Sequence, residues 1–181
     1  MKKYTIGIDF GTLSGRCLLA DVETGEETAT SVLEYRQRVM SETLPDGTRL
    51  GVDWHLQHPG DYLDVLRITI RDAIKQAGIR PEQVIGIGID TTGCTILPIK
   101  KDGTPLCFLE KWKGSPNAYV KLWKHHAAQP YADKMTEAAL ARNEKFIQRY
   151  GGKISSEWMF PKVWQVLDES PEIYEDTDAF L

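Results

Sequence analysis

Residues 4–20 have the sequence YTIGIDFGTLSGRCLLA, and this stretch decides the fold. Its first five residues form an apolar run that predicts a strand, and Cys17–Ala20 predicts a second strand that begins almost at once. Two glycines in the turn between them lack a Cβ and tolerate positive φ, so a ligand can approach the backbone closely. The antiparallel return places Asp9, Thr12 and Arg16 around one small concave surface.

This first turn has two interpretations. Its backbone N–H groups, the Thr12 hydroxyl and the Asp9 carboxylate form a suitable cradle for a phosphate group and a hydrated Mg²⁺. An ordinary β-hairpin would use the same residues, Asp-Phe-Gly-Thr, for turn chemistry alone. The motif by itself leaves the two interpretations almost equal, and a second glycine-containing turn favours the ligand site.

The second turn, Asp90–Thr95, directly follows the run Val84–Ile89. That run is apolar without polar alternation, which predicts a strand buried on both faces in a sheet with helices on each side. Ligands of open α/β sheets usually bind at the carboxyl ends of such strands. We therefore expect ligand contacts at both turns.

Composition limits the class of protein. The 181 residues are 41% hydrophobic and 27% charged, which suffices for one domain, or one domain plus a fragment. The net charge is −4 with scattered basic residues, which argues against nucleic acid as a partner. Cys17, Cys94 and Cys107 lie in apolar segments without C-x-x-C spacing, so we expect reduced core thiols. The first apolar run is too short for a signal peptide and no stretch approaches a membrane span, which predicts a soluble cytoplasmic domain without a membrane partner.

The remaining pattern predicts an antiparallel meander followed by helices. Apolar residues at helical spacing begin after Asp61, a candidate N-cap, and end at Gly78, a candidate C-terminal stop. Ser115 and Pro116 suit the start of a further helix. The expected strands are 4–10, 16–22 and 29–36, and the expected helices are 61–77, 117–126, 133–150 and 156–168.

An N-terminal meander that carries D-x-G-T, then a helix, then a buried strand resembles the opening of the actin-like ATPase fold, a ribonuclease-H-like class. Within that superfamily the chain resembles the sugar kinases that include glycerol kinase, xylulokinase and ribulokinase, and most of all the ribulokinase branch. The segments that carry this resemblance are Asp9–Arg16, Leu122–Ala128 and Gly151–Trp158. The resemblance implies an α/β fold in which parallel strands extend the antiparallel β-meander, with flanking helices.

The resemblance also implies how the chain is organised. Such kinases have two actin-like domains with ATP between them, so residues 1–181 correspond to an incomplete N-terminal sugar-binding domain without the second, ATP-binding domain. The implied reaction uses ATP and Mg²⁺ to phosphorylate the terminal hydroxyl of a ketopentose such as L-ribulose. The general-base aspartate of these enzymes is expected outside this chain, so the role is given to neither Asp168, Asp176 nor Asp178. The fragment alone is expected to be inactive, and a homodimer is compatible with the resemblance.

For the phosphate site, the resemblance implies that Asp9 holds Mg²⁺ through water. Gly11 and Thr12 would approach the transferring phosphate, and Arg16 would stabilise its charge, because phosphoryl transfer mainly requires positioning and charge neutralisation. Turn capping is the alternative for Asp9. A surface ion pair with a residue such as Glu34 is the alternative for Arg16.

For the sugar site, Gly93 and its neighbour stand where glycerol kinases carry an Arg-Glu pair, which leaves room for a five-carbon ketose. Trp123 matches a tryptophan that lies against the sugar, and Glu157 would accept hydrogen bonds from sugar hydroxyls. Gly93 and Trp123 are then expected within roughly 10–15 Å of each other. The alternatives are sheet packing for Gly93, core packing for Trp123 and a helix N-terminal charge for Glu157. His125 and His126 point to different sides of a helix, which argues against a two-histidine metal site.

Two other classes of protein share parts of this pattern. A non-catalytic actin-like module would bind sugar as a sensor or scaffold without turnover. A ribonuclease-H-type nuclease would need further carboxylates around paired metals and a basic face, against which the acidic balance argues.

Overall fold

The computed structural model describes residues 2–181, which divide into two compact units. The first, the sheet unit, combines the residues up to Arg38 with His58–Thr92. The second, the helical unit, combines Val39–Gln57 with Gly93–Leu181. Each unit has its own hydrophobic core. No helix among the described residues is long and apolar enough to cross a membrane.

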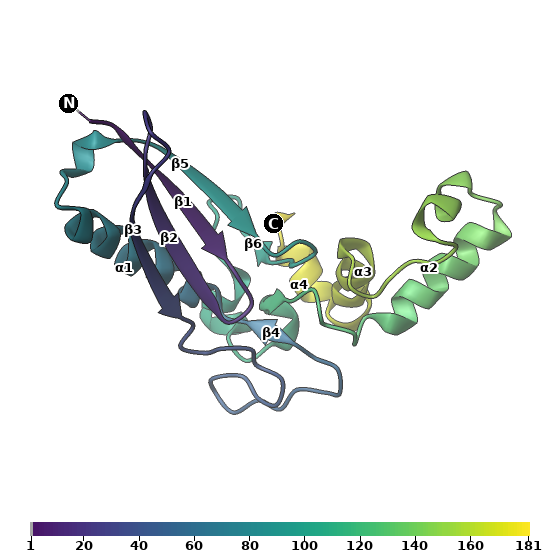
Figure 1. Ribbon diagram of the computed structural model, residues 1–181. Coiled ribbons are helices and arrows are strands. Elements are labelled where there is room, and N and C mark those ends of the chain that lie inside the picture. The colour runs from purple at the N-terminus through teal and green to yellow at the C-terminus, as the bar shows by residue number, and fades with distance from the viewer. Residues whose placement is uncertain (1) are drawn as a thin grey trace. The chain divides into compact units, whose positions relative to one another are not determined.

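The sheet unit contains a four-stranded mixed sheet in the order β3–β2–β1–β5 (Figure 1). The first three strands form an antiparallel meander, and β5 pairs with β1 in parallel. Their bounds are β1 (Tyr4–Phe10), β2 (Ser14–Asp21), β3 (Glu27–Glu34) and β5 (Val84–Thr91), and a short 3-10 helix, Pro81–Gln83, precedes β5. The predicted meander and its extension by a parallel strand are confirmed.

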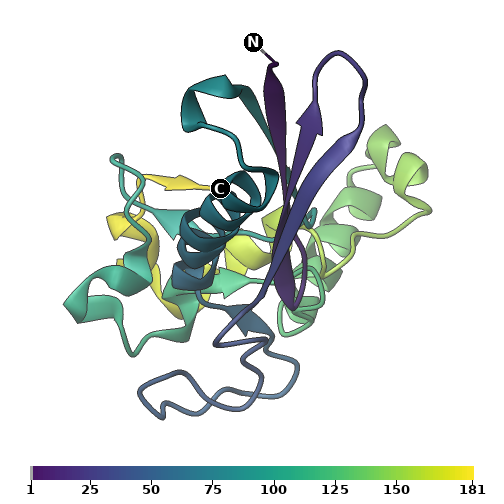
Figure 2. The same cartoon turned by 60° about the vertical axis from the view of Figure 1, so that its left-hand side comes forward.

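Helix α1 (Pro59–Ala77) lies along one face of this sheet (Figure 2). Gly78 ends it in a left-handed conformation with φ 63°, as predicted. The predicted N-cap is wrong, because Pro59 starts the helix earlier and the His58 Nδ1 atom accepts the Gly60 N–H at 3.1 Å. Asp61 is buried and accepts a backbone N–H instead. The core between α1 and the sheet contains Tyr4, Ile6, Ile8, Cys17, Leu19, Tyr35, Val65 and Ala73.

The predicted burial of the run in β5 on both faces is wrong for the part of the chain that the structure describes. Ile85, Ile87 and Ile89 are 56%, 58% and 63% exposed. The cause is topological, because among the described residues β5 is the outermost strand of the sheet and pairs with β1 alone. Helix α1 packs mainly over β2 and β3, so it leaves these three isoleucines uncovered.

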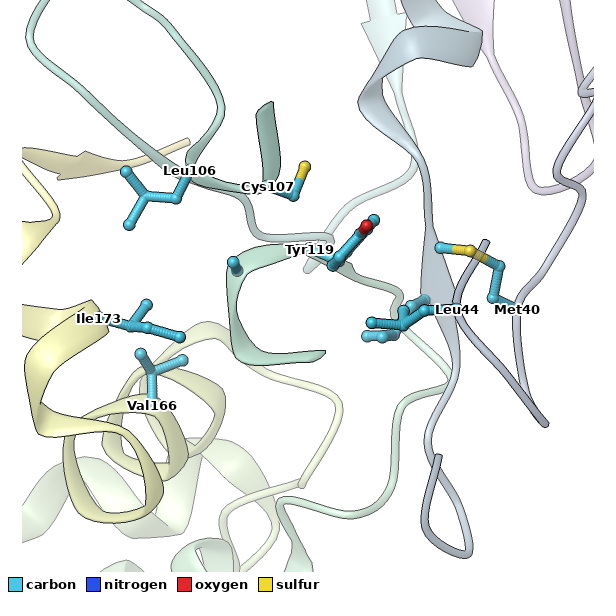
Figure 3. Packing of buried hydrophobic residues seen from close by; sticks show 9 residues of the cluster. Met40, Leu44, Leu106, Cys107, Tyr119, Val166 and Ile173 are labelled. Atoms are coloured by element: carbon cyan, nitrogen blue, oxygen red, sulfur yellow. The ribbon is translucent and has the colours of Figure 1, made fainter. Parts of the chain in front are cut away.

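The helical unit consists of short elements around a second core. Met40, Leu44, Tyr119, Val166 and Ile173 come from distant parts of the chain and meet in this core (Figure 3). Two strand pairs, β4 (Leu56–Gln57) with β7 (Val120–Lys121) and β6 (Pro98–Ile99) with β8 (Ala179–Phe180), are antiparallel. The helices are α2 (Gln129–Ala141), α3 (Met159–Glu169) and α4 (Pro171–Asp176), with 3-10 helices at Leu106–Phe108, Glu110–Trp112, Pro116–Ala118 and Lys145–Tyr150.

The predicted helix over residues 117–126 is wrong. A 3-10 turn at Pro116–Ala118 leads directly into β7. Every residue from Asn117 to Leu122 is buried, and a helix that packs through one face cannot bury six consecutive side chains. The predicted helix over residues 133–150 is shorter, because α2 ends at Ala141 and Asn143 follows with φ 53°. The third predicted helix corresponds to α3, whose first turn contains a proline.

Candidate functional site

The phosphate turn, Gly11–Leu13, connects β1 to β2 in the sheet unit. Asp9 and Arg16 are register partners on these strands, and the Arg16 Nη1 atom lies 3.9 Å from the Asp9 Oδ2 atom. Both side chains are about half exposed, at 55% for Arg16 and 50% for Asp9. The alternative partner, Glu34, pairs with Arg38 at 3.7 Å. The carboxylate beside Arg16 is therefore that of Asp9, the other candidate residue at this turn, and not that of Glu34.

Asp90 lies beside this pair and has no role in the sequence-based assignment. It is the register partner of Asp9 across the parallel strands β1 and β5, so both carboxylates start from the same face of the sheet. Its Oδ1 atom accepts the Thr91 N–H at 3.0 Å. Its position at the carboxyl end of the strand next to β1 could have identified it once the parallel register was known. The result is a row of two carboxylates and one guanidinium across three strands.

This row fits a hydrated Mg²⁺. Magnesium in phosphoryl-transfer sites is usually bound by one or two carboxylates, with phosphate and water supplying the remaining oxygens. Among residues 2–181, no group of three or more His, Cys, Asp or Glu side chains converges on one point. An ion held by Asp9, with or without Asp90, would take most of its ligands from water and phosphate.

The glycines of this segment have packing roles that the sequence did not reveal. Neither Gly11 nor Gly15 has a left-handed φ. The Gly11 N–H donates to the Ser14 carbonyl at 3.0 Å, and a Cβ on Gly11 would approach that oxygen to 3.0 Å. A Cβ on Gly15 would lie 2.7 Å from both methyl groups of Val65. The expectation that a ligand approaches both glycines is therefore wrong for Gly15, because the space beside Gly15 is filled by Val65 of α1.

The sugar-site candidates Gly93 and Trp123 both lie in the helical unit, and two sets of contacts bring their segments together. Ile96 and Lys121 exchange backbone hydrogen bonds of 3.0 and 2.9 Å. The Lys162 ammonium on α3 donates to the Cys94 and Leu122 carbonyls, each at 2.6 Å. With standard backbone dimensions, these bonds limit the distance between the Gly93 and Trp123 Cα atoms to about 14 Å.

Gly93 and Trp123 are both open to solvent in the described chain. A Cβ on Gly93 would meet no atom within 4 Å, and Trp123 is 39% exposed. These observations weigh against simple packing roles for both residues. Cys94 is exposed as well, so its prediction as a core thiol is wrong, whereas Cys17 and Cys107 are buried and free as expected. Cys94 has φ 58°, a left-handed conformation that is uncommon for a residue with a Cβ.

Glu157 lies just before Trp158, the N-cap residue of α3, and its side chain is 41% exposed. Its Oε1 atom is 4.0 Å from the Nε2 atom of His126. The other ring nitrogen of His126 is 3.1 Å from the Ser156 hydroxyl. This position suits both interpretations of Glu157, as a sugar contact and as a helix N-terminal charge. His126 is a neighbour that the sequence did not suggest.

His125, in contrast, is fully buried. Its Nδ1 atom accepts the His55 N–H at 3.2 Å, and its Nε2 atom is 2.8 Å from the Gln165 Oε1 atom. Burial and the nearby Lys121 ammonium lower the pKa of His125 to about 2. His125 is therefore neutral, carries its proton on Nε2 and supports the core rather than a surface site.

A cavity of about 610 Å³ lies elsewhere in the helical unit and contains none of the candidate residues. Its walls come from α2, α3 and the segment between them. Its lining is largely aromatic and aliphatic, with Arg142 and Glu144 as the charged members. We therefore do not assign this cavity to the phosphate or sugar chemistry that the two turns imply, despite its size.

Comparison with known proteins supports a family assignment. A family model described as "FGGY family of carbohydrate kinases, N-terminal domain" matches residues 4–181. The ribulokinase of Shouchella clausii (strain KSM-K16) is 55% identical over 182 residues, covering 100% of this chain and 32% of that protein. The ribulokinase of Halalkalibacterium halodurans is 51% identical over 180 residues, with 99% and 32% covered. The chain thus spans about a third of the length of these curated relatives.

Two solved structures share the fold. The gluconate kinase from Lactobacillus acidophilus is similar with a TM-score of 0.71 at 15% identity, covering 100% of this chain and 31% of that one. A xylulose kinase from Rhodospirillum rubrum also has a TM-score of 0.71, at 13% identity, with 98% and 32% covered. At such low identities the likeness establishes the α/β sugar-kinase fold alone.

Proposed function

Because this chain belongs to the FGGY family of carbohydrate kinases and matches its N-terminal domain, we propose that it is the sugar-binding part of an ATP-dependent ribulokinase. The reaction is transfer of the ATP γ-phosphoryl group to the terminal hydroxyl of L-ribulose or a related ketopentose, which fits arabinose catabolism. The observation that carries the proposal is the pairing of the segments that bear Gly93 and Trp123, both open to solvent. The relatives named ribulokinase, at 51–55% identity, support the choice of sugar.

At the phosphate turn, the proposed roles follow from the row of charges across the sheet. Asp9 holds Mg²⁺ through water, and the half-exposed Arg16 guanidinium beside it neutralises charge on the transferring phosphate. The Gly11 and Thr12 backbone approaches that phosphate from the turn. When bound, Mg²⁺ supplies charge neutralisation between the phosphate groups of ATP. Asp90 is an additional candidate for the hydrated ion.

At the sugar site, the Trp123 indole provides an apolar wall for the C–H-rich face of the ketose. The open space around Gly93 leaves room for the carbon chain of the ketose. Glu157 accepts hydrogen bonds from sugar hydroxyls, and His126 lies close enough to orient it. Such a site discriminates between stereoisomeric sugars because each of its polar groups hydrogen-bonds one particular hydroxyl.

The general base is proposed to lie in the part of the longer relatives that this chain does not span. Three late aspartates already have other partners. Asp168 accepts the Tyr131 hydroxyl at 3.0 Å, Asp176 lies 2.8 Å from the Lys111 ammonium, and Asp178 lies 3.2 Å from the Lys100 ammonium. We also propose a cytoplasmic location for the enzyme, and its assembly as a homodimer stays a prediction.

The decisive test is ATP consumption by the full-length protein that contains this chain, with L-ribulose, D-xylulose and glycerol offered separately. We expect the highest kcat/KM with L-ribulose and no turnover by residues 1–181 alone. Trp123→Ala in the full-length protein should weaken sugar binding and leave ATP binding largely intact. Sugar binding without any turnover would instead favour a non-catalytic sensor, and turnover by the fragment alone would contradict the two-domain interpretation.

A further inference from the structure

Lys162 has an unusual place for a lysine. It lies on α3 with no exposed surface, and its ammonium donates to two backbone carbonyls, those of Cys94 and Leu122. We propose that Lys162 is a positioning residue of the sugar site, which holds the turn after Gly93 against the segment that ends in Trp123. This inference rests on the proposed function and adds to it a residue that the sequence-based assignment of the site does not include.

The two hydrogen bonds are placed where such a role requires them. Cys94 directly follows Gly93, and Leu122 directly precedes Trp123. Two oxygens that share one ammonium at 2.6 Å each lie no more than about 5 Å apart. Each bond therefore fixes the backbone one residue away from a candidate sugar contact. Lys162 thus sets the spacing of the two contacts together with the Ile96–Lys121 backbone pair.

The backbone conformation of Cys94 explains what the hydrogen bond from Lys162 to the Cys94 carbonyl stabilises. Its left-handed backbone, with φ 58°, is unfavourable for a residue with a Cβ. The bond from Lys162 fixes the Cys94 carbonyl in the orientation that this conformation produces. Loss of the bond would let Cys94 relax to an ordinary conformation and would move Gly93 with it.

Core stability alone is a poor explanation for Lys162. Burying an ammonium group is costly, and an apolar side chain of similar length would fill the same space without that cost. Among the described residues, no carboxylate lies within 4.0 Å of Lys162 to compensate its charge. Burial lowers its pKa to about 8, against a weaker opposing effect of Cys94 and Glu157. The backbone carbonyls are the groups that compensate the buried ammonium.

Lys121 provides a matched control within the same unit. It is equally buried, but its ammonium donates to the Gln165 side chain at 3.1 Å and lies 4.0 Å from the centre of the Trp54 ring. Burial lowers the pKa of Lys121 well below its usual value and also lowers that of Lys162, so each variant removes a buried lysine side chain from the helical unit. Of these two lysine side chains, that of Lys162 donates to the backbone beside the sugar-site candidates, whereas that of Lys121 donates to a side chain.

The test compares Lys162→Met with Lys121→Met in the full-length protein, by calorimetric titration with L-ribulose without ATP, steady-state KM for both substrates and thermal unfolding. We expect Lys162→Met to weaken L-ribulose binding about tenfold, the effect of losing hydrogen bonds from a charged donor, with the KM for ATP unchanged within about twofold. Lys121→Met should change L-ribulose binding by less than about twofold while losing comparable stability.

A second variant separates positioning from stability. Glycine adopts the left-handed conformation without the Cβ penalty, so Lys162→Met combined with Cys94→Gly should recover a large part of the lost sugar affinity. If Lys162→Met does not fold, Lys162→Gln, which keeps an uncharged NH₂ donor group, takes its place in the same comparison. Equal loss of sugar affinity in the two lysine variants, or no recovery in the double variant, would overturn this inference alone. A wild-type protein that binds no sugar would overturn the proposed function and this inference with it.

Discussion

Replacing Gly93 with arginine should weaken sugar binding without loosening the fold. A Cβ at this position meets no atom within 4 Å, and Gly93 does not have a left-handed φ, so the backbone accepts a larger residue. We therefore expect the free energy of unfolding to change by less than about 0.5 kcal/mol, as for an open surface position.

The expected loss of affinity follows from the geometry of the site. An extended arginine reaches roughly 7 Å from its Cα atom by standard bond lengths, which is half of the maximum distance to the Trp123 Cα atom. Its guanidinium would occupy the space proposed for the ketose. The sugar would then lose two or three hydrogen bonds and part of its contact with Trp123, at about 1 kcal/mol each. A loss of about 2–3 kcal/mol corresponds to a dissociation constant raised roughly 30- to 150-fold.

The assay is calorimetric titration of L-ribulose into the full-length wild-type protein, Gly93→Ala and Gly93→Arg, together with thermal unfolding of each. The alanine variant adds only a methyl group to open space and should bind within about threefold of wild type. An arginine variant with wild-type affinity and wild-type stability would refute the placement of the sugar at this turn. An arginine variant that loses stability in parallel with affinity would refute the argument from open space.

Three further predictions concern the phosphate turn, the packing beneath it and the buried lysine. Asp9→Asn in the full-length protein should lower kcat about a hundredfold or more with little change in the sugar KM, because the proposed role of the carboxylate is to stabilise charge on the phosphoryl group during transfer. A near-normal kcat in steady-state assays would make Asp9 a turn residue. Gly15→Ala should cost about 1–3 kcal/mol in denaturant unfolding, because its Cβ would lie 2.7 Å from the Val65 methyl groups, and Val65→Ala in the same protein should remove most of that added cost. Lys162 has a folded-state pKa of about 8, below its ordinary value of 10.5, so between these pH values the unfolded chain binds more protons at this site. The stability of wild type relative to Lys162→Met should consequently rise from pH 8 to pH 10.5 in unfolding titrations, and a flat or falling difference would contradict the buried cation.

Local features of the fold were predictable because their signals lie close together in the sequence. The β1–β2 hairpin follows from two apolar runs around one short turn, and Gly78 ends α1 through its own conformational freedom. Asp9 and Arg16 could be placed together for the same reason, since they lie on adjacent strands of that hairpin. The phosphate half of the candidate site thus rests on short-range information.

The tertiary structure decided what depends on contacts between distant segments. Residues 117–122 carry helix-start signals, yet they form a 3-10 turn and a strand because all six are buried against other parts of the helical unit. Asp90 joins Asp9 through the parallel register of β5 with β1, and the isoleucines of β5 are exposed because β5 is the outermost strand of the sheet in the part of the chain that the structure describes. The sequence by itself determined the hairpin, its charges and the α/β class, because periodicity and turn chemistry act over a few residues. Which carbonyls Lys162 reaches, across 40 and 68 positions of the chain, was decided only by packing, because no local pattern encodes the partner of a buried side chain.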